Sequence, residues 1–183
     1  TLGSSFVSQR TATLFGLTVG IIGICERYGL KDKAVDFIKK LSKLTTGGLL
    51  SVWLVIRTLS AAFSLRLGGH VQFIRPIILP MAEGAAYVKF GEIDEKGEDE
   101  IKGAAAATEN YGNFYGQNCF MGASGTLLIV STLVAQGYEV DALQIAMASW
   151  PIAIVSMVVG IVMNFFVDRR LVARYAKKSP AAK

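Results

Sequence analysis

The stretch LQIAMASWPIAIVSMVVGIVMNFFV, residues 143–167, decides the fold class of this chain. It carries no charged side chain over 25 consecutive residues. A bilayer core about 30 Å thick is crossed by roughly 20 helical residues. The stretch is therefore long enough to cross a membrane as a tilted helix, and we expect it to do so.

The composition of the whole chain also indicates a membrane protein. Of 183 residues, 52% are hydrophobic and 18% are charged, whereas about a quarter of the residues of a soluble domain are charged. Four further apolar segments are expected to span the membrane as helices: 7–25, 47–67, 71–88 and 104–135. Together with 143–167 they predict an all-α, polytopic membrane protein with one transmembrane domain over residues 1–167. Because the chain begins at Thr1 rather than at Met, we expect further N-terminal sequence.

The basic residues, which give the chain a net charge of +5, gather in two segments, 27–43 and 169–183. Lysine and arginine are enriched in cytoplasmic loops, so we expect both segments and the C-terminus to be cytoplasmic. Anionic lipids rather than nucleic acid are the expected partners of these charges. Residues 31–44 place apolar side chains three and four positions apart, which predicts an amphipathic helix in the membrane interface. Residues 168–183 are expected to form a basic tail, and the acidic stretch 89–102 a cytoplasmic loop.

The segments 47–67 and 71–88 are predicted to form a helix hairpin around Gly68-Gly69-His70. The sequence is compatible with two full spans or with a re-entrant hairpin. Pro76 and Pro80 each lack an amide, which would free the carbonyls of Gln72 and Pro76 in an α-helix. At membrane depth such carbonyls need a partner, and transporters use interrupted helices of this kind to hold substrates and ions.

Charged residues inside the apolar segments are the strongest indication of function. An arginine at the centre of a membrane costs at least about 2.5–3.5 kcal/mol on insertion scales. Gln72, Arg75 and Glu83 would share one helix face, which must point at protein or water. The structural alternative is that Arg57 or Arg75 forms an internal ion pair with Glu83 that holds the helices in register.

The segment 104–135 changes character along its length. It opens with alanines, becomes polar and glycine-rich in TENYGNFYGQN at 108–118, and ends in an apolar run at 119–135. More than 30 residues exceed one crossing of roughly 20. We therefore expect a helix broken at membrane depth, with an interfacial loop leading into an ordinary span as the alternative.

The polar residues of the two interrupted segments predict a binding site for an anion. Arg57 or Arg75 would pair with a carboxylate. Glu83 and Glu109 are candidate coupling groups, because a buried carboxylate can bind sodium or titrate near neutrality. His70 could relay a proton or simply hydrogen-bond a loop. The candidate substrate-binding residues are Arg57, Gly68, Gly69, His70, Gln72, Arg75, Thr108, Asn110, Gln117 and Asn118.

Enzymatic function is not expected. The chain has no nucleophile motif, no P-loop and no dinucleotide-binding motif. Cys25 and Cys119 form no CxxC pair, and a single histidine completes no ligand set. We expect no catalytic residue, no metal centre and no cofactor, with a coupling sodium ion as the one exception under consideration.

Four motifs carry a resemblance to a known family: ERYGLK at 26–31, GGHVQFIRP at 68–76, PMAEGAA at 80–86 and ATENYGNFYGQN at 107–118. In this order they resemble a family of small bacterial inner-membrane proteins catalogued as domain of unknown function nine hundred and sixty-nine. The resemblance spans nearly the whole chain. Members are typically encoded beside a second, larger membrane protein and beside genes for pyroglutamate metabolism.

The resemblance implies the smaller subunit of a split secondary transporter in the bacterial inner membrane. The amphipathic helix, hairpin and broken helix are similar to those of the ion-transporter superfamily. The implied substrate is a small carboxylate such as pyroglutamate, coupled to sodium or protons, and the implied partner is the larger membrane protein. On this interpretation Arg75→Ala abolishes uptake and leaves membrane insertion intact. The alternative is a non-transporting assembly or regulatory subunit whose intramembrane charges are structural ion pairs.

Overall fold

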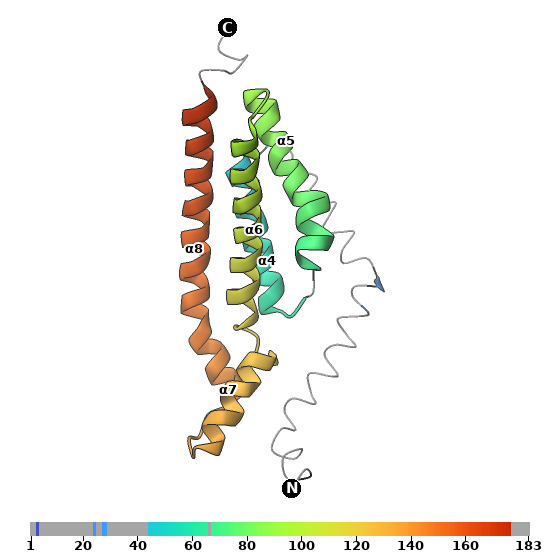
Figure 1. The fold of residues 1–183 in the computed structure, drawn as a ribbon. Helices are drawn as coiled ribbons and strands as arrows, with labels where there is room; N and C mark the ends of the chain where they lie inside the picture. Colours follow the sequence, from blue (N-terminus) through green and yellow to red (C-terminus); the bar gives the residue numbers. More distant parts are fainter. Residues whose placement is uncertain (1–2, 4–23, 25–26, 29–43, 66, 177–183) are drawn as a thin grey trace.

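The computed structural model describes residues 3, 24, 27–28, 44–65 and 67–176, and the statements below concern these residues. They form five α-helices and one π-helical segment and contain no strand, so the predicted all-α class is confirmed for this part of the chain. The elements are α4 (Thr46–Ala62), η1 (His70–Ile78), α5 (Leu79–Phe90), α6 (Glu95–Gln117), α7 (Ser124–Ala135) and α8 (Ala142–Tyr175) (Figure 1). The expected span 7–25 and interfacial helix 31–44 lie outside the described residues except for Ile24 and Leu44.

α4, η1 and α5 form a helical hairpin, in which α4 runs toward a loop at 63–69 and η1 and α5 return beside it (Figure 1). The loop can reverse the chain because Gly68 and Gly69 adopt positive φ angles of 82° and 63°, which glycine tolerates at no steric cost. At the open end of the hairpin, the Thr46 hydroxyl donates to the Ala82 carbonyl oxygen over 2.8 Å. The two arms are therefore antiparallel neighbours.

Pro76 lies inside η1, which is a π-helix of nine residues rather than an α-helix. In a π-helix each amide bonds to the carbonyl five residues before it, as the Leu79 amide does to the Ile74 carbonyl oxygen. The amide missing at Pro76 would therefore not have bonded to the Gln72 carbonyl, which corrects the expectation from α-helical spacing. Pro80 is the second residue of α5, which continues directly from η1.

The acidic stretch at 89–102, expected as a loop, contains the first two turns of α6. The Asp94 side chain caps this helix by accepting from the Gly97 amide over 2.9 Å. Acidic side chains in the first turn also interact favourably with the helix dipole. Six non-helical residues, 118–123, separate α6 from α7, so the segment 104–135 belongs to two helices with a break between them (Figure 1).

α8 runs almost the full height of the described structure (Figure 1). Its 34 residues, at a rise of about 1.5 Å each, span about 51 Å. In the described part of the chain it is the one helix that is long and apolar enough to cross a membrane, and only 17% of its most apolar window is buried. α8 continues past residue 167 to Tyr175. There Arg170 and Arg174 form ion pairs with Glu100 of α6 at 3.1 and 3.4 Å, so the first part of the expected tail is packed helix.

α4 and α6 pack at very close range. A Cβ atom built on Gly116 of α6 would lie 2.5 Å from the Thr58 carbonyl oxygen of α4, and one on Gly112 would lie 2.9 Å from the Arg57 side chain. Real Cβ contacts of this length essentially never occur. The two glycines therefore let the polar side chains of α4 and α6 meet directly.

Ala62, Cys119 and Ala153 pack together in a small buried cluster. This cluster shows which part of α8 lies beside the end of α4 and the break after α6. Ala62 ends α4 at the hairpin loop, and Cys119 lies in the break between α6 and α7. Ala153 lies close to the middle of the apolar stretch 143–167 of α8. The hairpin loop and the helix break therefore lie level with the middle of that stretch.

Candidate binding site at the hairpin loop and the helix break

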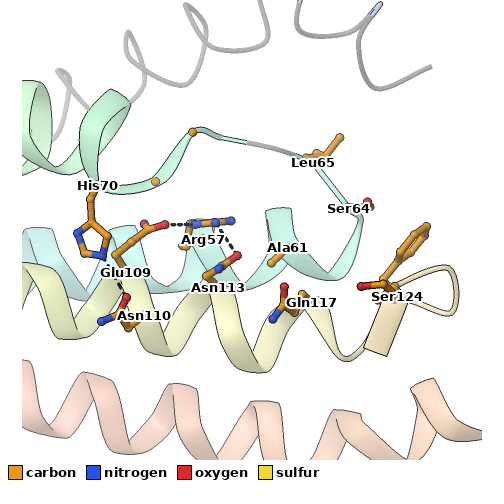
Figure 2. Close-up of a pocket in the computed structure, with 14 residues that line it drawn as sticks. Arg57, Ala61, Ser64, Leu65, His70, Glu109, Asn110, Asn113, Gln117 and Ser124 are labelled. Carbon is orange, nitrogen blue, oxygen red and sulfur yellow. Dashed lines mark hydrogen bonds and ion pairs between the residues drawn. The ribbon is translucent and has the colours of Figure 1, made fainter. Parts of the chain in front are cut away.

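A cavity of about 460 Å³ lies where the hairpin loop meets the break between α6 and α7 (Figure 2). Its lining combines charged, amide and hydroxyl side chains with small and apolar ones. The lining residues are Arg57, Ala61, Ser64, Leu65, Gly68, Gly69, His70, Glu109, Asn110, Asn113, Gln117, Phe120, Ala123 and Ser124. They come from α4, η1, α6 and α7 and from the two non-helical connections.

An ion pair between Arg57 of α4 and Glu109 of α6 forms the charged wall of the cavity (Figure 2). The Arg57 Nε donates to Glu109 Oε1 over 2.6 Å. Arg57 is 6% exposed and Glu109 is 2% exposed, so both charges are withdrawn from solvent. Each charge makes the burial of the other tolerable, and removal of one would leave the other uncompensated.

Two further hydrogen bonds hold this pair in place. The Trp53 Nε1 donates to Glu109 Oε2 over 3.2 Å, so both oxygens of the carboxylate accept from a fixed N–H group. The Arg57 Nη2 donates to Asn113 Oδ1 over 2.6 Å. Trp53 lies one turn before Arg57 on α4, and Asn113 lies one turn after Glu109 on α6, so each helix presents two polar side chains on one face.

His70, the first residue of η1, reaches across the cavity to α6. Its Nε2 lies 3.0 Å from Asn110 Oδ1, within hydrogen-bond distance. This contact ties the hairpin loop to α6 beside the Arg57–Glu109 pair (Figure 2).

Four helix ends meet at the cavity. α4 and α6 end there, and η1 and α7 begin there. The residues that precede the two helix starts, Gly69 and Ala123, provide no side-chain cap. The first amides of a helix lack intrahelical acceptors and carry partial positive charge, so two helix starts offer N–H donors suited to an anion.

The structure brings seven of the twelve residues predicted from the sequence to the cavity. These seven are Arg57, Gly68, Gly69, His70, Glu109, Asn110 and Gln117. Gln72 and Arg75 instead lie exposed on η1. Thr108 donates to Asn164 Oδ1 of α8 over 3.3 Å, and Asn118 donates to the Phe114 carbonyl oxygen.

The ion pairs considered for Glu83 as the structural alternative are not formed among the described residues. Arg57 pairs with Glu109 instead, and among the described residues no ion pair joins Glu83 to Arg57 or Arg75. Arg75 is exposed on η1 and does not line the cavity. Glu83 is half-buried on α5 and does not line the cavity either.

Several residues of the site were not predicted. Trp53 and Asn113 each lie one helical turn from a predicted charge, and that spacing could have identified them. Ser64 and Ser124 reach the cavity through the hairpin loop and the start of α7, and no local pattern marks them. Within the described residues, no group of three or more His, Cys, Asp or Glu side chains could hold a metal ion.

Comparison with known proteins identifies a family but no characterised relative. A family model described as Protein of unknown function (DUF969) matches residues 1–172. The chain therefore belongs to this family. No curated protein and no solved structure matches the chain.

Proposed function

We propose that this chain is the smaller subunit of a secondary transporter for a small carboxylate such as pyroglutamate, coupled to sodium or protons. It would reside in the bacterial inner membrane as a multi-pass protein with a cytoplasmic C-terminus and work with a second, larger membrane subunit. The observation that carries the proposal is the buried Arg57–Glu109 pair in a cavity between the hairpin loop and the helix break.

The position of the cavity along the apolar stretch of α8 supports transport. Ala62 and Cys119, at the loop and the break, pack on Ala153 near the middle of the apolar stretch of α8. If that stretch crosses the bilayer, the cavity lies near its midplane. Secondary transporters bind substrates at this depth, between discontinuous helices whose ends face the site.

The chemistry of the cavity supports a carboxylate. Two uncapped helix starts and the Arg57 guanidinium provide N–H donors on the walls, and Asn110 and Gln117 add amide groups. A volume of about 460 Å³ is within the usual range of small-molecule sites. Glu109 already balances the charge of Arg57, so an incoming anion needs an accompanying cation, which favours coupled transport.

The membrane assignment rests on the apolar surface of α7 and α8. α8 exposes valine, isoleucine, methionine and phenylalanine side chains along its length. α7 exposes Leu128, Ile129 and Val134. α4, one arm of the hairpin, has 17 residues, the short end of the range for one crossing, so a re-entrant hairpin and two full spans both stay compatible with this arrangement. Lipid and a second subunit would together cover this surface.

The Arg57–Glu109 pair also favours one alternative, an assembly subunit in which the pair only holds α4 and α6 together. Replacement of the pair by neutral groups, Arg57→Met with Glu109→Gln, separates the two functions, because the glutamine amide oxygen still accepts from Trp53. A structural pair should tolerate this replacement and retain activity of the assembled complex. A substrate site should lose uptake, because the guanidinium is gone.

Cysteine labelling tests the proposal directly. In a chain with Cys25 and Cys119 replaced by alanine, Ser124→Cys places a thiol on the cavity wall, and Ser131→Cys places one elsewhere on α7. We expect a water-soluble thiol reagent to modify the thiol at position 124, and pyroglutamate to slow that reaction but not the reaction at position 131. Equal rates with and without pyroglutamate, shown in the presence of the larger subunit, would contradict a carboxylate site here.

A further inference from the structure

We propose that the substrate carboxylate replaces Glu109 on Arg57, and that Glu109 takes up one proton as it is displaced. The inference rests on the carboxylate-binding function proposed above. It adds the identity of the coupling ion and the group that carries it. Transport would then be symport of one carboxylate with one proton, with no net charge moved.

The charge balance of the cavity motivates this exchange. In the unloaded protein Arg57 carries one positive charge and Glu109 one negative charge, 2.6 Å apart and both more than nine-tenths buried. A second carboxylate would leave one net negative charge in a site withdrawn from water, which is strongly unfavourable. When Glu109 binds a proton, Arg57 pairs with the substrate and the site is neutral again.

The hydrogen bonds of Glu109 favour a proton over a metal cation. In the unloaded site its Oε1 faces the Arg57 Nε–H and its Oε2 faces the Trp53 Nε1–H. The exchange therefore releases only Oε1, which is enough for a proton, whereas a hard metal cation is held by several oxygen ligands. A protonated carboxyl group still has an accepting oxygen. Trp53 can therefore stay bonded to Oε2 while Oε1, released by Arg57, carries the proton.

The other groups around Glu109 leave one competitor for the proton. α4 contributes Arg57 and Trp53, and α6 contributes the amides of Asn110 and Asn113, which do not titrate in this range. η1 contributes His70, which faces the same cavity. α7 contributes hydroxyl and apolar groups, and no described residue of α8 lines the cavity. A test must therefore distinguish Glu109 from His70.

Calorimetric titration with pyroglutamate, in buffers of different ionisation enthalpy, counts the protons taken up on binding. The full chain would be titrated together with the larger membrane subunit near neutral pH. We expect wild type to take up one proton per bound pyroglutamate, and Glu109→Gln to bind with no proton uptake. His70→Gln should still take up one proton, as should Glu100→Gln, a matched control on α6 whose carboxylate faces α8 arginines instead.

Each outcome decides between the two proposals. Binding by wild type without proton uptake overturns the exchange and leaves carboxylate binding intact. Proton uptake that persists in Glu109→Gln, or that disappears in His70→Gln, overturns the assignment to Glu109. No binding of pyroglutamate by any form contradicts the proposed function itself. The wild-type titration decides the first point even if Glu109→Gln does not fold.

Discussion

Replacing Arg57 by methionine should destabilise the protein strongly, because Glu109 then stays buried as an unpaired charge or must take up a proton. Glu109 is 2% exposed and keeps only the Trp53 N–H as a neutral donor. Removal of one partner of a buried ion pair costs about 3–5 kcal/mol. For a chain of this size that corresponds to a fall in Tm of about 6–20 °C.

A second substitution should recover most of this loss. In the double variant Arg57→Met with Glu109→Gln no buried charge remains, and the amide oxygen of glutamine still accepts from Trp53. Replacement of a buried pair by neutral groups of similar volume is often close to neutral. The double variant should therefore be more stable than Arg57→Met alone, although it still lacks the guanidinium that the substrate needs.

A double-mutant cycle uses four proteins: wild type, Arg57→Met, Glu109→Gln and the double variant. Thermal unfolding in detergent and uptake in proteoliposomes would be measured on each of them. We expect a coupling energy of at least about 2 kcal/mol between the two sites, with uptake lost in every variant that lacks Arg57. Additive effects on Tm would refute the buried ion pair. Recovery of uptake in the double variant would refute the role of Arg57 in substrate binding and favour the assembly-subunit alternative.

Three further predictions concern other parts of the structure. Gly116→Ala should push α4 away from α6 and lower the stability of the protein by about 1–3 kcal/mol through overpacking. Gly103→Ala, with nothing within 4 Å of the added Cβ, should be neutral or raise the stability by up to about 1 kcal/mol. Thermal unfolding measures both effects. Arg75→Ala should leave the Kd for pyroglutamate unchanged, because Arg75 does not line the cavity. The hydrogen bond from Tyr87, and then that from Lys102, lower the pKa of Glu98 below its ordinary 4.5, so Tyr87→Phe should raise this pKa, as measured by NMR of labelled glutamate.

Each of these predictions has a result that would contradict it. Equal loss of stability in Gly116→Ala and Gly103→Ala would contradict the close approach of α4 and α6. Loss of pyroglutamate binding in Arg75→Ala would restore the expectation drawn from the sequence. For Glu98, a lowered pKa means that its contribution to stability is present above 4.5 and is lost as the pH falls through the folded-state value. A pKa that does not change in Tyr87→Phe would contradict the hydrogen bond.

The helical class and the positions of the interruptions could be predicted because they depend on local chemistry. Apolar runs long enough for a helix, the glycines of the hairpin loop and the glycine-rich polar segment at 108–118 are all visible along the chain. The structure places the loop at 63–69 and the break at 118–123, close to these signals. Arg57 could be singled out because charged residues are rare in apolar segments, and Glu109 because it lies in the polar stretch 108–118 that interrupts one.

The pairing of the charges could not be predicted, because it depends on packing between distant segments. Glu83 and Arg75 share a helical face by spacing, but the π-helical turn around Pro76 changes the register of that face. The partner of Arg57 is set by the close approach of α4 and α6, which no local pattern encodes. Trp53 joins the site only because that approach brings it to Glu109.

Uptake of radiolabelled pyroglutamate into proteoliposomes tests whether this chain is a subunit of a carboxylate transporter. The chain would be reconstituted with and without the proposed larger membrane subunit, in sodium and in sodium-free buffer at two pH values. We expect uptake that requires both proteins, increases at the lower external pH and needs no sodium. Absence of uptake under every condition, with both proteins shown to be inserted, would contradict a pyroglutamate transporter.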